Sequence, residues 1–260
     1  MATQRATGDS PSPGSARRRP ADSGRREVPR HVACVMDGNG RWATQRSLPR
    51  TSGHRAAEAT VIDVIEAART TGVEWLTLYA FSTENWRRPD EEVDFLLRLV
   101  RQVVRKHAAL LHARGIRCRF LGMADARIPA ALARDAADLM TLTGANRGMT
   151  LTVAFDHGGR GDIVEAARSL IRSGLPAEDV DEDVFAAHLP FPDTPDVDLV
   201  IRTSGEQRIS NFMLWQVAYA EWIFPPVLWP DFRAPHFVQC VHAYRQRDRR
   251  FGGVRSNVNG

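Results

Sequence analysis

The sequence predicts an α/β protein in which a mostly parallel central sheet is flanked by helices. Two observations predict this class. Short apolar runs rich in β-forming residues alternate with longer stretches of helical periodicity from residue 31 onward, and neither an internal repeat nor a linker interrupts them. Such alternation gives parallel strands covered by helices, with ligands bound beyond the carboxyl ends of the strands. We therefore expect one domain over residues 30–260.

The expected elements follow one another in a regular order. Strands are expected at residues 31–36, 75–81, 116–121, 149–155 and 198–202. Helices are expected at residues 54–70, 91–114, 126–142, 161–173, 181–189 and 235–248. The helix over 91–114 has a broad apolar face opposite a basic one, which predicts packing against the core. A helix that lines a hydrophobic ligand channel or touches lipid is the alternative.

Composition and charge exclude several classes of protein. Hydrophobic residues make up 43% of the chain and charged residues 25%, which is typical of a soluble globular protein. The formal net charge of +4 resides entirely in residues 1–30, which hold seven arginines and three acids. The remaining residues are balanced in charge, so they do not form a uniformly cationic nucleic-acid binder, and we expect no nucleic-acid partner.

The first 29 residues differ from the rest of the chain. They contain no Leu, Ile, Phe, Trp or Tyr and hold four prolines, which predicts a disordered Arg/Pro-rich extension. No stretch of about 18 apolar residues and no secretory signal is found, so a transmembrane segment is not expected. The three cysteines form no CxxC pair, which indicates neither a disulfide framework nor a zinc site and fits a reducing, cytoplasmic compartment.

The first candidate site directly follows the strand at 31–36. Residues 37–41 read DGNGR, an acid and two glycines followed by an arginine. Glycines let backbone N–H groups approach an anion, an arginine can bind two phosphate oxygens, and a carboxylate beside phosphate is a natural Mg²⁺ ligand. The alternative is a Gly-Asn-Gly turn in which Asp37 caps the following helix.

Two further segments carry polar groups near expected element ends. Arg50, His54 and Arg55 gather where the helix at 54–70 is expected to start, and cations there are unfavourable unless an anion is bound. A surface or capping role is the alternative for His54. Residues 79–89 place hydroxyls, an amide and two arginines beside Phe81 and Trp86, which suits a site for an apolar chain with a charged head. A solvated loop held by two aromatic side chains is the alternative.

The segment at 198–221 is the most informative. Arg202, Arg208 and Ser210 crowd around a strand end and a Gly-containing turn, an arrangement that can bind a diphosphate, and Glu221 follows an apolar stretch. Two arginines six residues apart can also be plain surface charge, but the turn after an apolar strand favours the site.

Five motifs together carry a resemblance to a known family. They are MDGNGRWA (36–43), GH (53–54), LYAFSTENWRRP (78–89), DLVIRTSGEQRISNF (198–212) and VLWPDF (227–232). In this order they resemble the cis-prenyltransferases, the undecaprenyl diphosphate synthase family. No DDxxD motif is found, which argues against the unrelated trans-prenyltransferases.

The resemblance implies a fold and an activity. The family has a parallel-sheet α/β domain with a hydrophobic tunnel between sheet and helices, and it works as a homodimer. Its members condense isopentenyl diphosphate onto an allylic diphosphate with Mg²⁺ and form Z double bonds. For this chain the resemblance implies a Z-polyprenyl diphosphate of undecaprenyl or decaprenyl type, made from farnesyl or geranyl diphosphate, with at most peripheral membrane contact.

The resemblance also implies roles for individual residues. Asp37 positions Mg²⁺, and Glu221 supplies a further metal contact. The allylic diphosphate is held by Gly38, Asn39, Gly40, Arg41 and Arg50, with His54 beside it. Isopentenyl diphosphate is held by Arg202, Arg208 and Ser210. Asn85 or His54 orients the final proton loss, in which a diphosphate oxygen accepts the proton. The remaining expected substrate contacts are Trp42, Phe81, Ser82, Glu84, Trp86 and Arg88.

Two features of the resemblance leave questions open. The family usually has Asn-Tyr-Gly-Gly-Arg where residues 156–160 read DHGGR, a change that affects either substrate choice or a structural contact. Residues 250–252 resemble a family element that reaches the isopentenyl site across the dimer. A short-chain or irregular terpenoid synthase of the same fold and a non-catalytic partner subunit are the alternative functions.

Overall fold

The computed structural model describes residues 28–123 and 125–247. The extension expected over residues 1–29 therefore lies almost wholly outside the described residues, and so does the element expected at 250–252.

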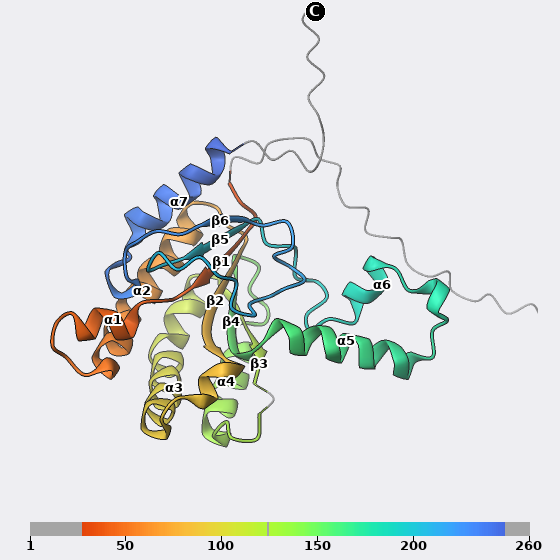
Figure 1. The fold of residues 1–260 in the computed structure, drawn as a ribbon, viewed down its shortest axis with the longest axis horizontal. Coiled ribbons are helices and arrows are strands. Elements are labelled where there is room, and N and C mark those ends of the chain that lie inside the picture. Colours follow the sequence, from red (N-terminus) through yellow and green to blue (C-terminus); the bar gives the residue numbers. More distant parts are fainter. Residues whose placement is uncertain (1–27, 124, 248–260) are drawn as a thin grey trace, which may run out of the picture.

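One six-stranded parallel sheet forms the centre of the molecule (Figure 1). The strand order is β3-β4-β2-β1-β5-β6, and every neighbouring pair is parallel. The strands are β1 (His31–Val35), β2 (Trp75–Ser82), β3 (Arg117–Gly122), β4 (Thr150–His157), β5 (Leu199–Arg202) and β6 (Glu221–Ile223). The predicted fold class is confirmed, and the first five strands lie where the sequence predicts them. The sequence did not predict β6, because three residues are too few to show a strand pattern.

Seven helices lie along the described chain between and after the strands. They are α1 (Asn39–Thr44), α2 (Arg50–Thr70), α3 (Asp90–Ala113), α4 (Ala130–Thr143), α5 (Gly159–Ser173), α6 (Glu182–Ala187) and α7 (Ala234–Gln246). Short 3₁₀ turns span Thr83–Arg87, Ala177–Asp179 and Trp229–Asp231. None of the described helices is long and apolar enough to cross a bilayer.

Two helix starts differ from the sequence prediction by four residues, and one helix was not predicted. The helix α4 begins at Ala130 rather than at residue 126, after Pro129 at its N-cap. The helix α2 begins at Arg50, four residues before the expected start, because Pro49 occupies its N-cap with the extended backbone that a helix entry requires. Residues expected to form a loop after β1 instead form the six-residue helix α1. Its N-cap is Gly38 in the left-handed conformation, so Asp37 does not cap it.

The two faces of the sheet are covered differently. Alternate residues of β1 point to opposite sides: Val32 and Cys34 join a cluster built with α2, α3, α4 and α7, whereas Ala33 and Val35 join a second cluster. That second cluster is closed by residues of the 209–217 segment, among them Phe212, Met213 and Val217. Both faces are therefore buried, which explains the nearly continuous apolar runs of the strands.

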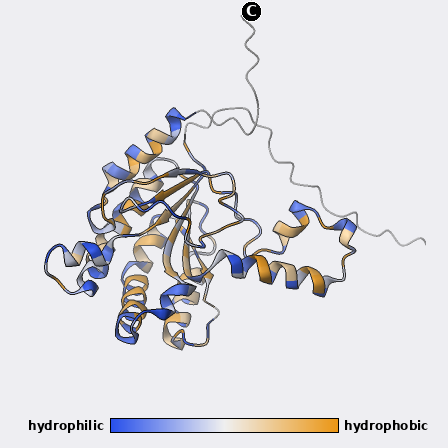
Figure 2. Cartoon of the chain, in the orientation of Figure 1, coloured by the Kyte–Doolittle hydropathy of each residue, from blue (hydrophilic) through white to orange (hydrophobic). Residues whose placement is uncertain are grey.

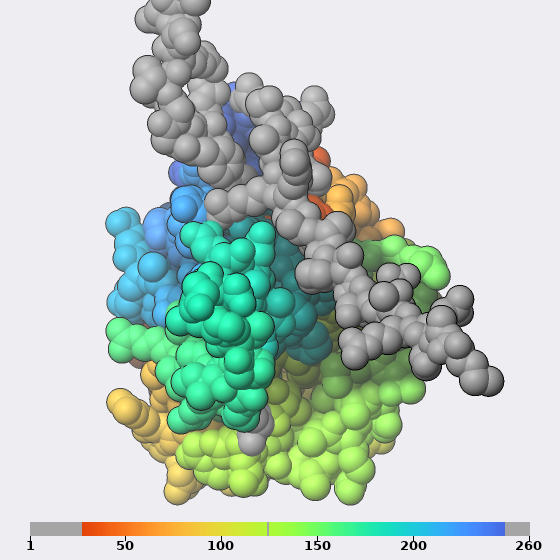
Figure 3. All heavy atoms as spheres, turned by 90° about the vertical axis from the view of Figure 1, so that its right-hand side faces the viewer, coloured from red at the N-terminus to blue at the C-terminus, as the bar shows by residue number. Residues whose placement is uncertain are grey.

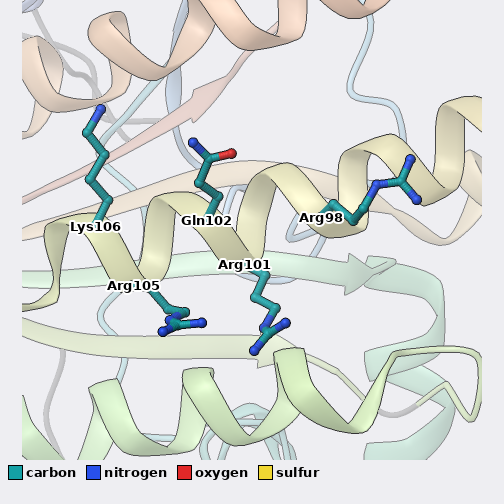
Figure 4. Close-up of a pocket in the computed structure, with 5 residues that line it drawn as sticks. All are labelled: Arg98, Arg101, Gln102, Arg105 and Lys106. Carbon is teal, nitrogen blue, oxygen red and sulfur yellow. The ribbon is translucent and has the colours of Figure 1, made fainter.

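The helix α3 packs its apolar face against the core, as predicted. Buried residues on that face include Val93, Leu97 and Val104. Its basic face borders a shallow hollow of about 560 Å³, and Figure 4 shows the residues around it: Arg98, Arg101, Gln102, Arg105 and Lys106. A second hollow, of about 770 Å³, lies at the amino ends of β2 and β4. Neither is a tunnel between sheet and helices, so the tunnel stays a prediction.

The helix pair α5–α6 projects from the body of the molecule as an arm (Figure 1). Figure 3, turned so that this side faces the viewer, shows the arm standing in front of the sheet. Among the exposed large hydrophobic residues on it are Val164, Ile171, Leu175 and Val180, and Ile171 is 80% exposed. Figure 2 shows hydrophobic residues along α5. This arm leaves an apolar surface uncovered in a single chain.

Close contact between α1 and α2 depends on one glycine. A Cβ atom at Gly53 would lie 1.9 Å from the carbonyl oxygen of Asn39, a distance that no real side chain tolerates. Gly53 therefore allows the start of α1 to rest directly on the backbone of α2.

Substituting this glycine should destabilise the protein. We expect Gly53→Ala to lower the free energy of unfolding by about 2 kcal/mol or more, because the backbone of α1 must move to relieve the overlap. Gly161→Ala in α5 is the matched control, since a Cβ there meets nothing within 4 Å. The control should be neutral or stabilising by about 0.5 kcal/mol, as alanine favours helix. Denaturant unfolding of both variants checks this, and equal stabilities would contradict it.

Candidate active site

The candidate site residues lie at the carboxyl edge of the sheet. Asp37 follows β1 by two residues, Arg202 is the last residue of β5, and Ser82 is the last of β2. The chain passes from β1 to β2 on one side, and β5 later adds on the other side. This strand order makes a topological switch point at β1, where α/β sheets bind their ligands.

A buried ion pair joins Asp37 and Arg202. The Nη2 atom of Arg202 donates to Oδ2 of Asp37 at 2.8 Å, and the Arg202 side chain is 4% exposed against 27% for Asp37. Nη1 of Arg202 donates to Ser210 Oγ at 2.7 Å and to the carbonyl of Arg208 at 2.5 Å. The Nε–H is buried without a partner among the described residues. A guanidinium carries five N–H donors, and this Nε–H is a buried donor that the described residues leave without an acceptor.

The backbone of Asp37 is held by Thr203, which the sequence did not single out. The Thr203 hydroxyl accepts from the Asp37 amide at 3.0 Å and donates to the Asp37 carbonyl at 2.7 Å. The carboxylate also accepts from the Gly38 amide at 2.7 Å. These bonds fix the direction of the carboxylate toward the edge of the sheet. In the sequence, only the position of this hydroxyl, directly after Arg202 at the end of β5, could have indicated its role.

Arg41 and Arg208 meet at a second acid that the sequence did not single out. Arg41 lies 3.5 Å from Asp37 Oδ1 and 3.3 Å from Glu206 Oε1. Arg208 also pairs with Glu206, and its side chain is 63% exposed. Arg41 and Arg202 therefore both pair with Asp37, and Arg208 joins the cluster through Glu206.

A second charged cluster lies beside the first and contains Arg50, His54 and Arg88 around Glu92. Glu92 accepts from Arg88 at 2.9 Å and from Arg50 at 3.4 Å, and His54 Nε2 is 3.5 Å from its carboxylate. Burial tends to raise the pKa of Glu92, but the charges of Arg88 and Arg50 outweigh it and lower that pKa. Glu92 supplies the anion that a cation at the start of α2 requires. The sequence missed Glu92, which is one acid among several at the start of α3.

His54 is neutral at physiological pH in this cluster. Burial and the neighbouring Arg88 lower its pKa to about 4, and the attraction of Glu92 offsets this only in part. The structure places it in the second turn of α2 rather than at the helix start, and its side chain is only 12% exposed, so it is neither a surface nor a capping residue.

Gly40 of α1 lies against Arg50 of the second charged cluster. A Cβ atom at Gly40 would lie 2.6 Å from Nη1 of Arg50, so the guanidinium rests directly against the backbone of α1. The structure thus brings residues 37–41 and Arg50 together, as the sequence predicted.

The segment after β2 is ordered by its own side chains. Asn85 Oδ1 accepts from the Ser82 amide at 3.1 Å, and the Ser82 side chain completes the capping box. Phe81 is 1% exposed and packs on Trp86 and Phe155, so it lies in the core. Trp86 donates to Asp156 Oδ1 at 2.7 Å. The acid that replaces the usual family asparagine at 156 therefore holds Trp86 in place.

Three further expected site residues have other partners. Trp42 donates to Asp231 at 2.7 Å on the side of the 229–231 turn. Glu84 accepts from Asn211 at 3.0 Å. Glu221 is the first residue of β6, in register with Leu199, and its carboxylate accepts from Arg247 at 2.7 Å.

The described chain does not bring Glu221 into contact with Asp37, because register with Leu199 places it three residues before the end of β5. No group of three or more His, Cys, Asp or Glu side chains in the described residues could hold a metal by itself.

Comparisons with known proteins identify the family of this chain. The family described as "Putative undecaprenyl diphosphate synthase" matches residues 35–252. A trans,polycis-polyprenyl diphosphate synthase ((2Z,6E)-farnesyl diphosphate specific) of Thermobifida fusca is 48% identical over 96% of this chain and 90% of its own length. The isoprenyl transferase of Bacillus subtilis is 47% identical over 88% of this chain and 89% of its own.

Solved structures show the same similarity. A lavandulyl diphosphate synthase from Lavandula x intermedia, in complex with dimethylallyl diphosphate, superposes with a TM-score of 0.82 at 36% identity, over 87% of this chain and 99% of that one. A probable undecaprenyl diphosphate synthase from Campylobacter jejuni gives 0.73 at 29% identity, over 86% and 98%. This chain therefore belongs to the undecaprenyl diphosphate synthase family of cis-prenyltransferases.

Three buried histidines should make the protein sensitive to acid. Burial lowers the pKa of His31, His54 and His157 to about 4 in the folded state, against 6.5 for an ordinary histidine. Between these values the unfolded chain binds protons that the folded chain does not, so stability falls as the pH drops from about 6.5 to about 4. Thermal midpoints measured across this range check the sign. His54→Gln should flatten the dependence, and a midpoint that rises on acidification would contradict it.

Proposed function

We propose that this chain condenses isopentenyl diphosphate onto an allylic diphosphate, with farnesyl or geranyl diphosphate as primer, to give a Z-polyprenyl diphosphate of undecaprenyl or decaprenyl type. The observation that carries the proposal is the Asp37–Arg202 pair at the switch point of the sheet, with further arginines on both sides of it. The relatives named as polyprenyl diphosphate synthase and isoprenyl transferase support the product class.

Two diphosphate sites fit the two charge clusters. For the allylic diphosphate we propose residues 38–41 with Arg50, whose guanidinium lies against Gly40. For isopentenyl diphosphate we propose Arg202, Arg208 and Ser210, which are joined through bonds to Arg202. Loss of diphosphate from the allylic carbon places growing negative charge on the leaving group. Guanidinium groups fixed before the reaction stabilise that charge without reorganising.

Mg²⁺ fits the donor set at Asp37. Proteins commonly hold this ion through one or two carboxylates together with substrate phosphates and water, and Asp37 offers one partly exposed carboxylate beside the proposed diphosphate sites. Bound there, the ion would neutralise charge on the leaving diphosphate. The role of Glu221 as a further contact stays a prediction of the resemblance, since its carboxylate faces Arg247.

The same residues suggest how the last proton is lost. We propose that a diphosphate oxygen accepts it, with Asn85 or His54 orienting the step. His54 is neutral because of its lowered pKa, and the Asn85 carbonyl oxygen is already taken by the Ser82 amide. The NH₂ group of Asn85 can act as a donor toward a diphosphate oxygen.

We also propose a homodimer that works in the cytoplasm, with at most peripheral membrane contact. The apolar residues of the α5–α6 arm need a cover, and a second copy of the chain supplies one of matching chemistry. The three cysteines are free and buried, which suits a reducing compartment.

A second candidate is a synthase of the same fold with a short or irregular product. The likeness to a lavandulyl diphosphate synthase favours it, at 36% identity, but the polyprenyl relative is closer in sequence at 48%. A non-catalytic partner subunit is disfavoured, because Asp37 and Arg202 are present and bonded to one another.

Product analysis tests the activity. Purified protein with Mg²⁺, farnesyl diphosphate and radiolabelled isopentenyl diphosphate should give long-chain products on thin-layer chromatography. Asp37→Ala should lower incorporation about 10²- to 10³-fold, the range seen when a main electrostatic group is removed. The matched control is Asp63→Ala, an exposed acid of α2 paired with Arg233, which should leave turnover within about twofold. Full activity of Asp37→Ala would refute the assignment, and only short products would favour the second candidate.

Oligomeric state tests the role of the arm. The double variant Val164→Asp, Ile171→Asp places two charges on the proposed interface and should shift the molar mass from dimer to monomer. Val238→Asp on α7 is the control, because Val238 is also exposed, at 44%, but lies off the arm. Light scattering after size exclusion measures the mass. A monomeric parent protein, or a double variant that remains dimeric, would count against the proposed dimer.

A further inference from the structure

His157 and Asp162 form a buried pair behind the proposed isopentenyl diphosphate site. His157 ends β4 and is 1% exposed, and Asp162 lies in the first turn of α5. Nδ1 of His157 is 3.4 Å from Oδ2 of Asp162, a long contact in which neither atom has another partner among the described residues. None of the roles proposed so far uses either residue.

The other ring nitrogen of His157 faces a backbone amide. The Met213 N–H donates to His157 Nε2 at 3.2 Å. Nε2 must therefore be the unprotonated nitrogen, and the ring proton resides on Nδ1. That atom lies 3.4 Å from Asp162 Oδ2 without a hydrogen bond between them. If the ring were protonated, its Nε2–H and the Met213 N–H would both be donors and would face each other. Burial lowers the pKa of His157 to about 4, which agrees with a neutral ring.

Met213 belongs to a loop whose backbone is unusual. Ser210, Asn211 and Met213 all have positive φ, at 53°, 60° and 42°. Non-glycine residues hold this conformation only where surrounding contacts determine it. The loop needs such contacts because it carries Arg208 and Ser210, the residues proposed to hold isopentenyl diphosphate.

Anchors to the loop come from several parts of the sheet edge. From β2, the Tyr79 hydroxyl donates to the Ser210 carbonyl at 3.4 Å. After β2, Glu84 accepts from Asn211. From β5, Arg202 donates to Ser210 Oγ and to the Arg208 carbonyl. From the start of α5, the amides of Gly159 and Arg160 donate to Asn211. From β4, His157 accepts the Met213 amide, and the Tyr79 hydroxyl donates to the His157 carbonyl at 3.1 Å. Among these, His157 is the side chain that accepts a backbone N–H of the loop.

We propose that His157, with Nε2 unprotonated, is a positioning residue for isopentenyl diphosphate: it holds the Met213 amide and thereby the loop that presents Arg208 and Ser210. This inference rests on the proposed function for its substrate. It also explains the departure at position 157, where the family usually has tyrosine. The ring packs edge-on against both Tyr79 and Phe212, so it fills an aromatic site while supplying an acceptor.

Two substitutions distinguish the effect of losing the hydrogen-bond acceptor from the effect of losing the ring. His157→Phe keeps an aromatic ring and removes both polar contacts, whereas His157→Gln keeps an acceptor near the position of Nε2. We expect His157→Phe to raise KM for isopentenyl diphosphate about tenfold, the size of one lost hydrogen bond, with KM for farnesyl diphosphate within about twofold. The Met213 amide should exchange its hydrogen faster. His157→Gln should restore both values to near those of the parent protein.

A matched control distinguishes positioning from stability. His31 is equally buried and bonds the Pro195 carbonyl and Thr77 instead of the loop, so His31→Phe should lower the thermal midpoint without a selective change in KM.

Unchanged KM and exchange in His157→Phe, or no rescue by His157→Gln, would overturn the proposal. If His157→Phe does not fold, His157→Asn replaces it, since asparagine keeps a donor to Asp162 but loses the Met213 acceptor. If the parent protein incorporates no isopentenyl diphosphate, the proposed function fails, and Met213 exchange still decides the role of His157.

Discussion

The arrangement of the site depends on the buried guanidinium of Arg202. A charge in the interior is stable only where acceptors surround it, and here Asp37, Ser210 and the Arg208 carbonyl do so. These three come from chain segments after β1 and after β5, so satisfying one cation brings together two parts of the sequence about 170 residues apart. The same contacts thus stabilise the buried charge of Arg202 in the fold and place that charge beside Asp37.

Much of the fold and part of the site could be predicted from the sequence. The strands were predictable because burial on both faces leaves continuous apolar runs, and Asp37, Arg41 and Arg202 were predictable because they follow such runs directly. The partners that distant elements contribute to the site could not be predicted. Glu92 looks like any acid in the first turn of a helix, and only the packing of α3 beside α2 brings it to Arg50 and His54. Thr203 likewise acquires its role from the neighbouring strand.

The sequence also could not show which of the expected site residues form hydrogen bonds with partners outside the site. Glu221 and Trp42 belong to motifs of the family, yet in this chain they bond Arg247 and Asp231. A motif fixes which residues are present, whereas the register of β6 and the path of the 229–231 turn decide what they touch. The short helix α1 was missed for a related reason. Its N-cap is Gly38 and its second residue is Gly40, two glycines that favour a loop locally, and contact with α2 overrides that preference.

The buried cysteines have a consequence for how motion in this protein can be followed. Burial raises the pKa of Cys34 far above the ordinary range, and that of Cys118 to about 11 and Cys240 to about 12, so in the folded chain the reactive thiolate is scarce. Cys34 lies in β1, the strand that leads to Asp37, and Cys240 lies in α7. Alkylation of each thiol then requires an opening of its own element. The chain thus carries native chemical reporters for the centre of the sheet and for one of its covering helices.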